Sequence, residues 1–433
     1  MNEELVKEPG DMPEINDEKC SKKLILRIFI FIAILIVLAG IILILYFFVF
    51  KKSEDKKEEN EEKDEKKEEK DEGYIPDYND LVPELLNDTN ITFLSDVSYS
   101  KEKIKNTFKK GGANFNEDIG NINNGEDYQK NERNVFDIYF PDKNVANLKK
   151  PIILNLHGGG WTQLSKETLT PYCLNLTEEG YITVNMGYTL IFQPNTTSNI
   201  YRILDEITAT ISSVKRLLSK LGYNNNELSI AVGGYSTGGN LALLYGYLNK
   251  EKTDIPVKFI INLLGPTTLE YQYYYKLKDG EEPLDNIDPK SIEEGKDKLE
   301  AINNNLFNHQ SILYLMYLFQ GEMPNPNEMA IIMANGSINI ECEEYKKLLN
   351  KVKYTFPVTY VNNNSLPAIN VYSGKDSVIG VKHYSYLVEK GGDFKNVLMY
   401  SKSYDHDNLF YENPDSFQLF LSHITNFTDL YIN

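Results

Sequence analysis

The sequence contains few of the residues from which metal, disulfide and phosphate sites are built. Its 433 residues include three cysteines, five histidines and one tryptophan, and they form neither a metal-ligand cluster nor a phosphate-binding glycine loop. Cys173 and Cys342 can pair or stay free, and Cys20 is a candidate acylation site. We therefore expect no cofactor and no metal ion.

Positive charge is scarce relative to negative charge. The chain has 45 Lys and Arg against 63 Asp and Glu, which gives a formal net charge of −18 at pH 7. A surplus of this sign repels the phosphates of nucleic acids and the headgroups of anionic lipids. Neither is expected as a partner, and the sequence does not indicate the oligomeric state.

One segment lacks charge altogether. Residues 28–50 are uncharged, and a helix of that length spans about 35 Å, enough for a bilayer core of about 30 Å. The alternative is a secretory signal peptide, but residues 46–50 offer no small-residue cleavage site. We predict a transmembrane helix over 28–50.

The residues around this helix bear on its orientation. Lysines flank it on both sides and do not decide the question, but a short tail ahead of a long domain usually stays in the cytosol. We expect a cytoplasmic tail over 1–27 and single-pass type II anchoring, with the downstream domain in the endoplasmic reticulum and secretory lumen or outside the cell. Glycosylation sequons give this placement only weak support. They lie at Asn87, Asn90, Asn175, Asn195, Asn335, Asn363 and Asn426.

A charged low-complexity segment follows the uncharged one. Residues 51–72 contain eight Lys and twelve Asp or Glu, a composition that cannot bury a core. We interpret residues 51–90 as a solvated stalk that joins the membrane helix to the domain.

The most informative motif is G-x-S-x-G at residues 234–238. Apolar residues 230–232 predict a buried strand before it, and residues 241–244 continue as a helix after it. A strand that turns sharply into a helix strains the residue at the turn and needs small neighbours on both sides. Ser236 is then a candidate nucleophile, and the N–H of Thr237 is a candidate oxyanion donor.

A second motif, H-G-G-G-W at residues 157–161, follows the apolar stretch 151–156. Consecutive glycines let backbone N–H groups approach a substrate oxygen without interference from side chains. The N–H groups of Gly158 and Gly159 are therefore candidates for the rest of an oxyanion hole. For this motif alone, the alternative is a merely flexible turn.

With these two motifs the chain resembles the α/β-hydrolase superfamily over about residues 135–430. Within it, the chain is similar to HGGG-type esterases and lipases, either hormone-sensitive-lipase-like or BD-FAE-like carboxylesterases. The resemblance implies the chain order nucleophile, acid, base, so both partners follow Ser236. Tyr235 and Thr237 replace the Asp and Ala of the G-D-S-A-G-G elbow in arylacetamide-type deacetylases, which weighs against that substrate class.

Two residues after the serine suit the roles of acid and base. Asp376 follows the apolar strand expected at 368–373, where these enzymes carry the acid, although it can instead cap a helix beginning near residue 381. His406 follows the last expected strand, at 397–400, and is the candidate base. His423 is its rival, but it lies inside a helical pattern.

Strands and helices are expected to alternate between the motifs. Strands are expected over 181–184 and 257–264, an amphipathic helix over 199–221, and an earlier antiparallel strand at 136–140. This pattern predicts an α/β fold with a mainly parallel central sheet. The resemblance makes it an α/β-hydrolase domain over 91–433.

The segment 266–357 interrupts this alternation. It contains an apolar helix candidate at 306–320, which suits either a lid or ordinary packing. We expect the segment to be a cap over the site, because such scaffolds place specificity in loops after strands. A membrane-skimming lid is the weaker option.

The resemblance implies a serine hydrolase that cleaves carboxylic esters through Ser236, His406 and Asp376 by way of an acyl-enzyme. The expected partner is a small-molecule or lipid ester. Two alternatives stay open, namely a catalytically silent adhesion or binding module and an amidase or peptidase.

Overall fold

The computed structural model describes most of the chain from residue 81 onward. The described ranges are 81–86, 89–99, 133–142, 149–191, 199–249, 253–278, 281, 296–302, 307–334, 336–391, 394–401, 404–406 and 413–432. The predicted tail, the transmembrane helix and the stalk up to residue 80 lie outside them.

The localisation expected from the sequence requires a correction. Among the described residues, no helix has the length and apolarity needed to cross a membrane. Single-pass type II anchoring, with a lumenal or extracellular domain and glycosylation, is therefore not supported. The predicted span over 28–50 is not among the residues on which this finding rests.

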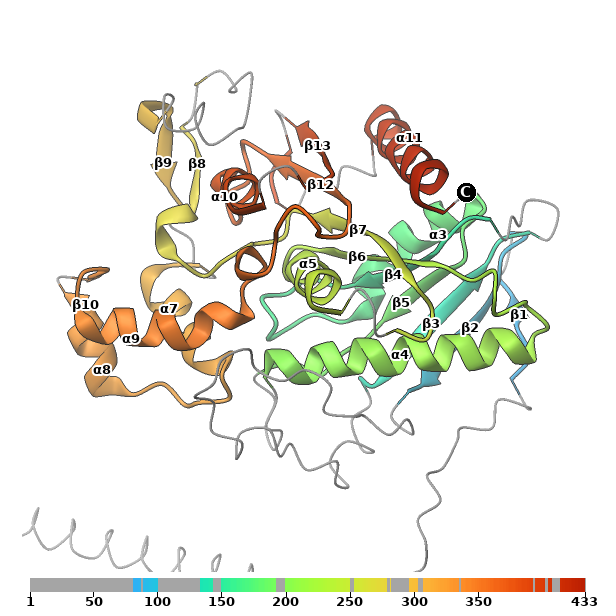
Figure 1. The fold of residues 1–433 in the computed structure, drawn as a ribbon, viewed down its shortest axis with the longest axis horizontal. Helices are drawn as coiled ribbons and strands as arrows, with labels where there is room; N and C mark the ends of the chain where they lie inside the picture. The colour runs from blue at the N-terminus through green and yellow to red at the C-terminus, as the bar shows by residue number, and fades with distance from the viewer. Residues whose placement is uncertain are drawn as a thin grey trace, which may run out of the picture. The chain divides into compact units, whose positions relative to one another are not determined.

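A nine-stranded sheet forms the centre of the described domain, in the order β1-β2-β3-β5-β4-β6-β7-β12-β13 (Figure 1). The first three strands pair antiparallel, as does β3 with β5, and all pairs from β5 to β13 are parallel. The inner parallel strands β4 to β12 are buried along almost their whole length, because helices cover both of their faces. Their bounds are β1 Glu84–Leu85, β2 Thr92–Ser98, β3 Val135–Phe140, β4 Ile152–Leu156, β5 Thr183–Met186, β6 Ile230–Tyr235, β7 Val257–Leu263, β12 Ala368–Ser373 and β13 Asn396–Ser401.

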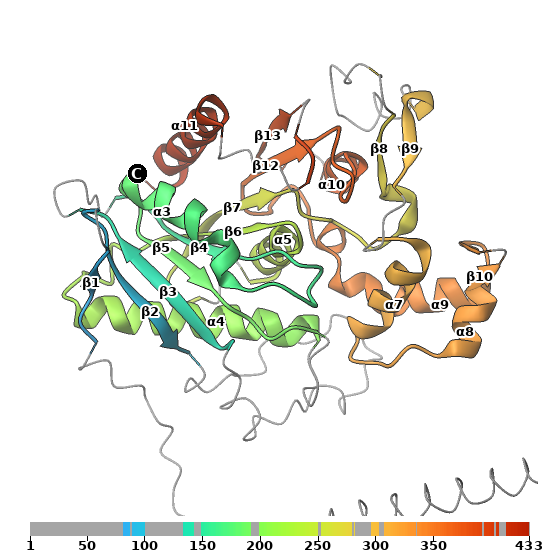
Figure 2. The same ribbon diagram turned by 180° about the vertical axis from the view of Figure 1, so that it is seen from behind.

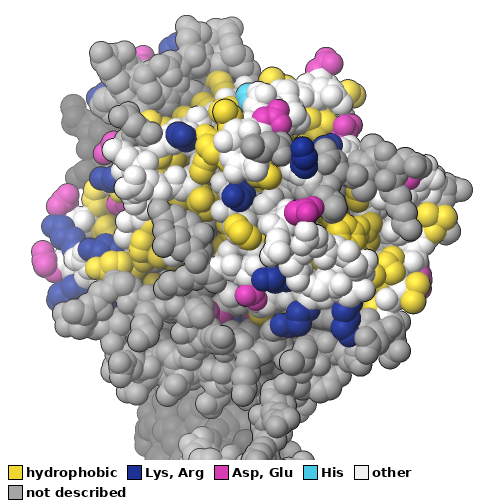
Figure 3. Space-filling view, turned by 45° about the vertical axis from the view of Figure 1, so that its right-hand side comes forward, with side chains coloured by type: hydrophobic (Ala, Val, Ile, Leu, Met, Phe, Trp, Pro, Cys, Tyr) yellow, Lys and Arg dark blue, Asp and Glu magenta, His cyan; other side chains and the backbone are white. Residues whose placement is uncertain are grey.

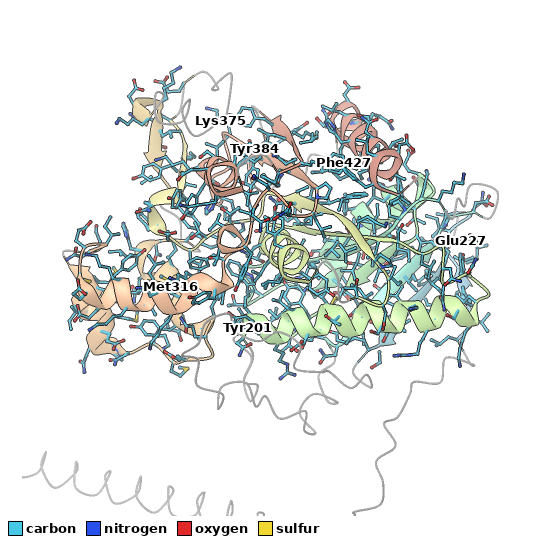
Figure 4. The ribbon with its side chains drawn as sticks, in the orientation of Figure 1. Tyr201, Glu227, Met316, Lys375, Tyr384 and Phe427 are labelled. Atoms are coloured by element: carbon cyan, nitrogen blue, oxygen red, sulfur yellow. The ribbon has the colours of Figure 1, made fainter. Side chains whose placement is uncertain are left out.

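Two sets of helices sandwich this sheet, as the opposite views of Figures 1 and 2 show. One face is covered by α4 (Ile200–Lys220), α5 (Thr237–Asn249) and α10 (Lys382–Gly391), whose apolar residues share one core with the sheet. The other face is covered by α3 (Thr170–Glu178) and α11 (Pro414–Tyr431). Phe427 of α11 points toward the sheet in Figure 4, where its ring packs edge-on against Phe259 of β7. The expected α/β architecture with a mostly parallel sheet is thus confirmed.

The segment between β7 and β12 forms a separate group of elements. Its described residues include three α-helices, α7 (His309–Leu318), α8 (Pro326–Ile332) and α9 (Glu343–Val352), which lie beside the sheet (Figures 1 and 2). The apolar helix expected at 306–320 corresponds to α7, whose side chains Ile312, Leu313 and Met316 are buried. Two small antiparallel sheets of two strands each accompany the helices, β8 (Tyr275–Leu277) with β9 (Leu299–Ala301) and β10 (Met333–Ala334) with β11 (Ser337–Ile338).

Short 3-10 helices link several of these elements. They are η2 (Lys166–Leu169), η3 (Tyr271–Tyr273), η4 (Lys296–Lys298), η5 (Lys353–Thr355) and η6 (Pro357–Thr359). Tyr201 of α4, labelled in Figure 4, donates its hydroxyl hydrogen to the carbonyl of Tyr354 at 3.2 Å and so joins the sheet's helix layer to η5.

The two cysteines among the described residues do not form a disulfide. Cys173 is buried, Cys342 is half-buried, and both are free thiols. On the face drawn in Figure 3, basic and acidic side chains of the described residues are interspersed with apolar ones. That face therefore presents no single field of positive charge.

Candidate active site

Ser236 lies at the turn between β6 and α5. Its φ of +54° falls in the left-handed region, which non-glycine residues adopt rarely and which often marks functional sites. Its N–H donates to the carbonyl of Leu263 at 2.7 Å, which ties the turn to β7. Gly238 packs so closely on β4 that a Cβ there would overlap the carbonyl oxygen of Leu156. The strand, turn and helix therefore occupy the positions that the G-x-S-x-G pattern predicts.

The side chains of Ser236, His406 and Asp376 form one continuous chain of hydrogen bonds. His406 Nδ1 lies 2.9 Å from Asp376 Oδ2, and His406 Nε2 lies 2.9 Å from Ser236 Oγ. Because the carboxylate can only accept, Nδ1 carries the hydrogen and Nε2 can accept the hydroxyl hydrogen of Ser236. His423 lies on α11 and makes no such contact among the described residues.

Backbone groups hold the carboxylate of Asp376 in this orientation. Asp376 is fully buried, and its Oδ1 accepts the N–H groups of Val378 and Ile379, each at 2.8 Å. These bonds close a turn ahead of α10, which begins at Lys382. The side chain thus does what a cap does for local backbone, and it also reaches the imidazole.

The H-G-G-G-W loop lies directly against Ser236. A Cβ placed on Gly158 would stand 3.1 Å from the Cβ of Ser236, so only a residue without a side chain lets the backbone come this near. Gly159 (φ +107°), Gly160 (φ +61°) and Trp161 (φ +61°) all adopt left-handed backbone conformations. The predicted oxyanion residues Gly158 and Gly159 are therefore beside the predicted nucleophile.

The directions of the Gly158 and Gly159 N–H groups follow from two hydrogen bonds. Tyr188 donates its hydroxyl hydrogen to the carbonyl of His157 at 2.8 Å, and His157 Nδ1 donates to the carbonyl of Gly158 at 2.7 Å. In a trans peptide the N–H points opposite to the preceding C=O, so each bond orients the next N–H. Burial lowers the pKa of His157 to about 4, which keeps this ring neutral near pH 7. Its ring also stacks on Tyr188, with centroids 4.1 Å apart.

The far end of this loop is held as well. The N–H of Trp161 donates to Thr237 Oγ1 at 3.4 Å, and its carbonyl accepts the N–H of Ile191 at 2.8 Å. Its indole ring packs edge-on against Phe319, just after α7, at 4.6 Å between centroids. These contacts hold the loop at its far end and place Phe319, from the segment between β7 and β12, against it. Thr237 itself begins α5, so its N–H has no acceptor inside that helix.

Three residues that hold the loop and the proposed base in place were not predicted from the sequence. Tyr188 orients the loop, Tyr235 donates its hydroxyl hydrogen to the carbonyl of His406, and Asp405 accepts hydrogen bonds from Ser377 and His406. Only Tyr235 carried a signal, because it departs from the elbow pattern. Tyr188 acts on a carbonyl far away along the chain, and Asp405, although it precedes His406 directly, also bonds to the distant Ser377; no local motif reports either of these long-range contacts.

No metal site accompanies this arrangement. In the part of the chain that the structure describes, no three His, Cys, Asp or Glu side chains gather closely enough to hold a metal ion.

Comparison with known proteins agrees with this architecture. The BD-FAE family model matches residues 136–322, a stretch that includes the loop and Ser236 but ends before Asp376. A truncated form of a carbohydrate esterase from gut microbiota superposes with a TM-score of 0.51 at 13% identity, covering 79% of this chain and 99% of that one. Inhibited esterase B from Lactobacillus rhamnosis gives 0.50 at 14% identity, with 82% and 90% covered.

The fold is an α/β-hydrolase fold.

Curated relatives match only a part of this chain. The non-reducing polyketide synthase atr1 of Stereocaulon alpinum is 30% identical over 136 residues, which is 31% of this chain and 5% of the synthase. The 5-methylorsellinic acid synthase of Aspergillus terreus is 28% identical over 145 residues, or 32% and 6%. The chain thus spans about a twentieth of these relatives' length. The BD-FAE match covers less than half of this chain, and the two solved structures show that the fold is shared.

Proposed function

We propose that this protein hydrolyses carboxylic esters with Ser236 as nucleophile, His406 as general base and Asp376 as the acid that orients it. The observation that supports the proposal most is the unbroken chain of hydrogen bonds from Asp376 through His406 to Ser236. In such an arrangement the histidine removes the serine hydroxyl proton and so activates a weak nucleophile.

The reaction would proceed in two halves. His406 Nε2 takes the Ser236 hydroxyl proton as Oγ bonds to the ester carbonyl carbon, and the N–H groups of Gly158, Gly159 and Thr237 receive the oxyanion. The C–O bond then breaks, and the alcohol leaves with the proton from His406. Water adds to the acyl-enzyme in the same manner, releases the acid and restores Ser236.

The insertion would form one wall of the substrate site. Phe307 and Phe319 flank the indole of Trp161, which ends the proposed oxyanion loop. This contact supports the role of cap for residues 266–357. We infer a small-molecule ester substrate whose acyl length a panel of esters from acetate to long-chain acyl groups would define.

Substitution of the nucleophile tests the proposal. Ser236→Ala should lower turnover roughly a million-fold, as loss of the nucleophile does in another serine hydrolase, and should abolish labelling by a fluorophosphonate probe. Ser229→Ala is the matched control, because Ser229 is buried directly before the same strand and its hydroxyl has no hydrogen-bond partner among the described residues. It should keep full activity.

Other results would contradict the proposal in identifiable ways. Folded wild-type protein that no fluorophosphonate labels would favour a silent binding module. Labelled protein that cleaves amides or peptides but no ester would favour an amidase or a peptidase.

A further inference from the structure

Two pairs of consecutive residues face each other where the acid and the base meet. Asp376 and Ser377 follow β12, and Asp405 and His406 follow β13, which pairs parallel with β12. Asp376 bonds to His406 in the proposed triad. Beside that bond, Ser377 donates both its N–H, at 2.9 Å, and its hydroxyl hydrogen, at 2.7 Å, to Asp405 Oδ1.

The same oxygen of Asp405 has a third donor. The backbone N–H of His406 lies 2.7 Å from Asp405 Oδ1. One carboxylate oxygen therefore joins the backbone of the base to the backbone of the acid loop. The imidazole must lie within hydrogen-bond reach of both Ser236 and Asp376. A fixed His406 backbone therefore reduces the number of conformations in which the imidazole is out of place.

Charge adds to this geometric effect. Asp405 is exposed, and although its partial burial acts to raise the pKa, the hydrogen bonds from Ser377 and the charge of a protonated His406 hold the pKa of Asp405 below its usual range. Asp405 is thus ionised near pH 7, and its negative charge favours the protonated imidazole in return. Among the described residues, Asp376, Asp405, Tyr235 and Ser236 all make hydrogen bonds to His406.

We propose that Asp405 is a positioning residue for His406, acting with Ser377 to hold the proposed base against Ser236. The inference rests on the proposed function, because it assigns a role in that same site. The hydrogen bonds of Asp405 run to Ser377 and His406 and not to Ser236. Its effect passes entirely through His406.

Three substitutions separate geometry from charge. Asp405→Ala removes both and should lower kcat about 10- to 100-fold with KM within about twofold, because a misplaced base slows proton transfer and not substrate binding. Asp405→Asn keeps an acceptor oxygen, so kcat should fall by less than about threefold. It should also move the acid limb of the kcat/KM profile a few tenths of a pH unit lower, the size expected for an exposed charge pair. Ser377→Ala, which keeps the backbone donor, should lower kcat about threefold.

Asp254→Asn is the matched control. Asp254 is likewise an exposed carboxylate that accepts a serine hydroxyl, from Ser212 at 2.6 Å. It precedes β7 and so lies at the amino ends of the parallel strands, whereas the proposed site lies at their carboxyl ends. It should leave kcat and the pH profile unchanged. Melting temperatures of all variants show whether the fold survives, and if Asp405→Ala unfolds, Asp405→Asn and Ser377→Ala still decide the question.

The outcomes separate this inference from the function on which it rests. The second-order rate constant of fluorophosphonate labelling, measured against pH, reports the activated serine without knowledge of the natural substrate. If the probe labels the wild type, and the Asp405 and Ser377 variants react at the wild-type rate with the wild-type pH profile, the positioning role is wrong but the proposed function stands. A lowered melting temperature with unchanged kcat would do the same. Wild type that no probe labels would overturn the function and, with it, this inference.

Discussion

Ser236 and His406 meet in one hydrogen bond, yet the protein positions them by different means. Ser236 is held by the backbone, since its N–H donates to Leu263 and its carbonyl accepts the N–H groups of Gly239 and Asn240 at 2.9 and 3.2 Å. His406 is held by side chains, namely those of Asp376, Asp405 and Tyr235. The first arrangement depends on close packing of main chain, and the second on polar groups that can be replaced one at a time.

This difference predicts two kinds of response to substitution. Main-chain atoms in contact cannot move apart without displacing whole strands, so a side chain added at the elbow should disrupt the fold. Polar groups around His406 can be changed at nearly constant volume. There we expect graded losses of activity in a folded protein.

The largest effect should come from filling the closest backbone contact. Gly238→Ala places a Cβ on the carbonyl oxygen of Leu156, where neither backbone can yield, and should cost several kcal/mol and leave little folded protein. Gly222→Ala is the control, because nothing lies within 4 Å of its added Cβ and its φ of +87° alone should cost about 1 kcal/mol. Urea unfolding measures both. A Gly238→Ala protein as stable as Gly222→Ala would show that close main-chain packing does not hold the turn at Ser236.

This elbow was also the part of the site most readable in the sequence. A strand, a strained serine and glycines two residues away from it are all local, so residues 230–244 carry the information by themselves. The helix expected over 199–221 was found at Ile200–Lys220 for a similar reason, since its apolar residues recur every three or four positions.

The next largest effect concerns the acid. Asp376→Asn can still accept the N–H groups of Val378 and Ile379, but its amide hydrogens would face His406 Nδ1 and force the hydrogen onto Nε2. An imidazole in that tautomer cannot take the proton of Ser236, so kcat should fall about 10⁴-fold, as in another serine hydrolase. The measurement is the rate of ester hydrolysis, made together with the melting temperature to show that the variant is folded. A loss below tenfold would remove Asp376 from the role.

Contacts between distant segments were not readable in the same way. Ser377 and Asp405 meet only because β12 and β13 pair in register, and no spacing along the chain reports that pairing. Asp376 and His406 were selected by chain order in a resembling superfamily and by their places just after expected strands, but neither signal shows that their side chains meet. The insertion was recognised as an interruption of the alternation, whereas its contact with Trp161 through Phe319 required the folded structure.

The smallest effect should come from the oxyanion loop, where the two modes of support combine. Tyr188→Phe keeps the ring stacked on His157 but removes the hydroxyl hydrogen donated to the His157 carbonyl. The peptide plane that orients the N–H of Gly158 then loses one support. We expect kcat to fall about tenfold at constant KM, less than loss of a whole oxyanion donor costs. The free energy of unfolding should fall by about 1–3 kcal/mol, because the carbonyl of His157 is left unpaired.

Tyr247→Phe is the control. The buried hydroxyl of Tyr247 has no hydrogen-bond partner among the described residues, so this variant should change neither kcat nor the free energy of unfolding. Equal kinetics for the two variants would mean that the glycine backbone orients this loop without help from side chains, and the loop would then join the elbow in the comparison.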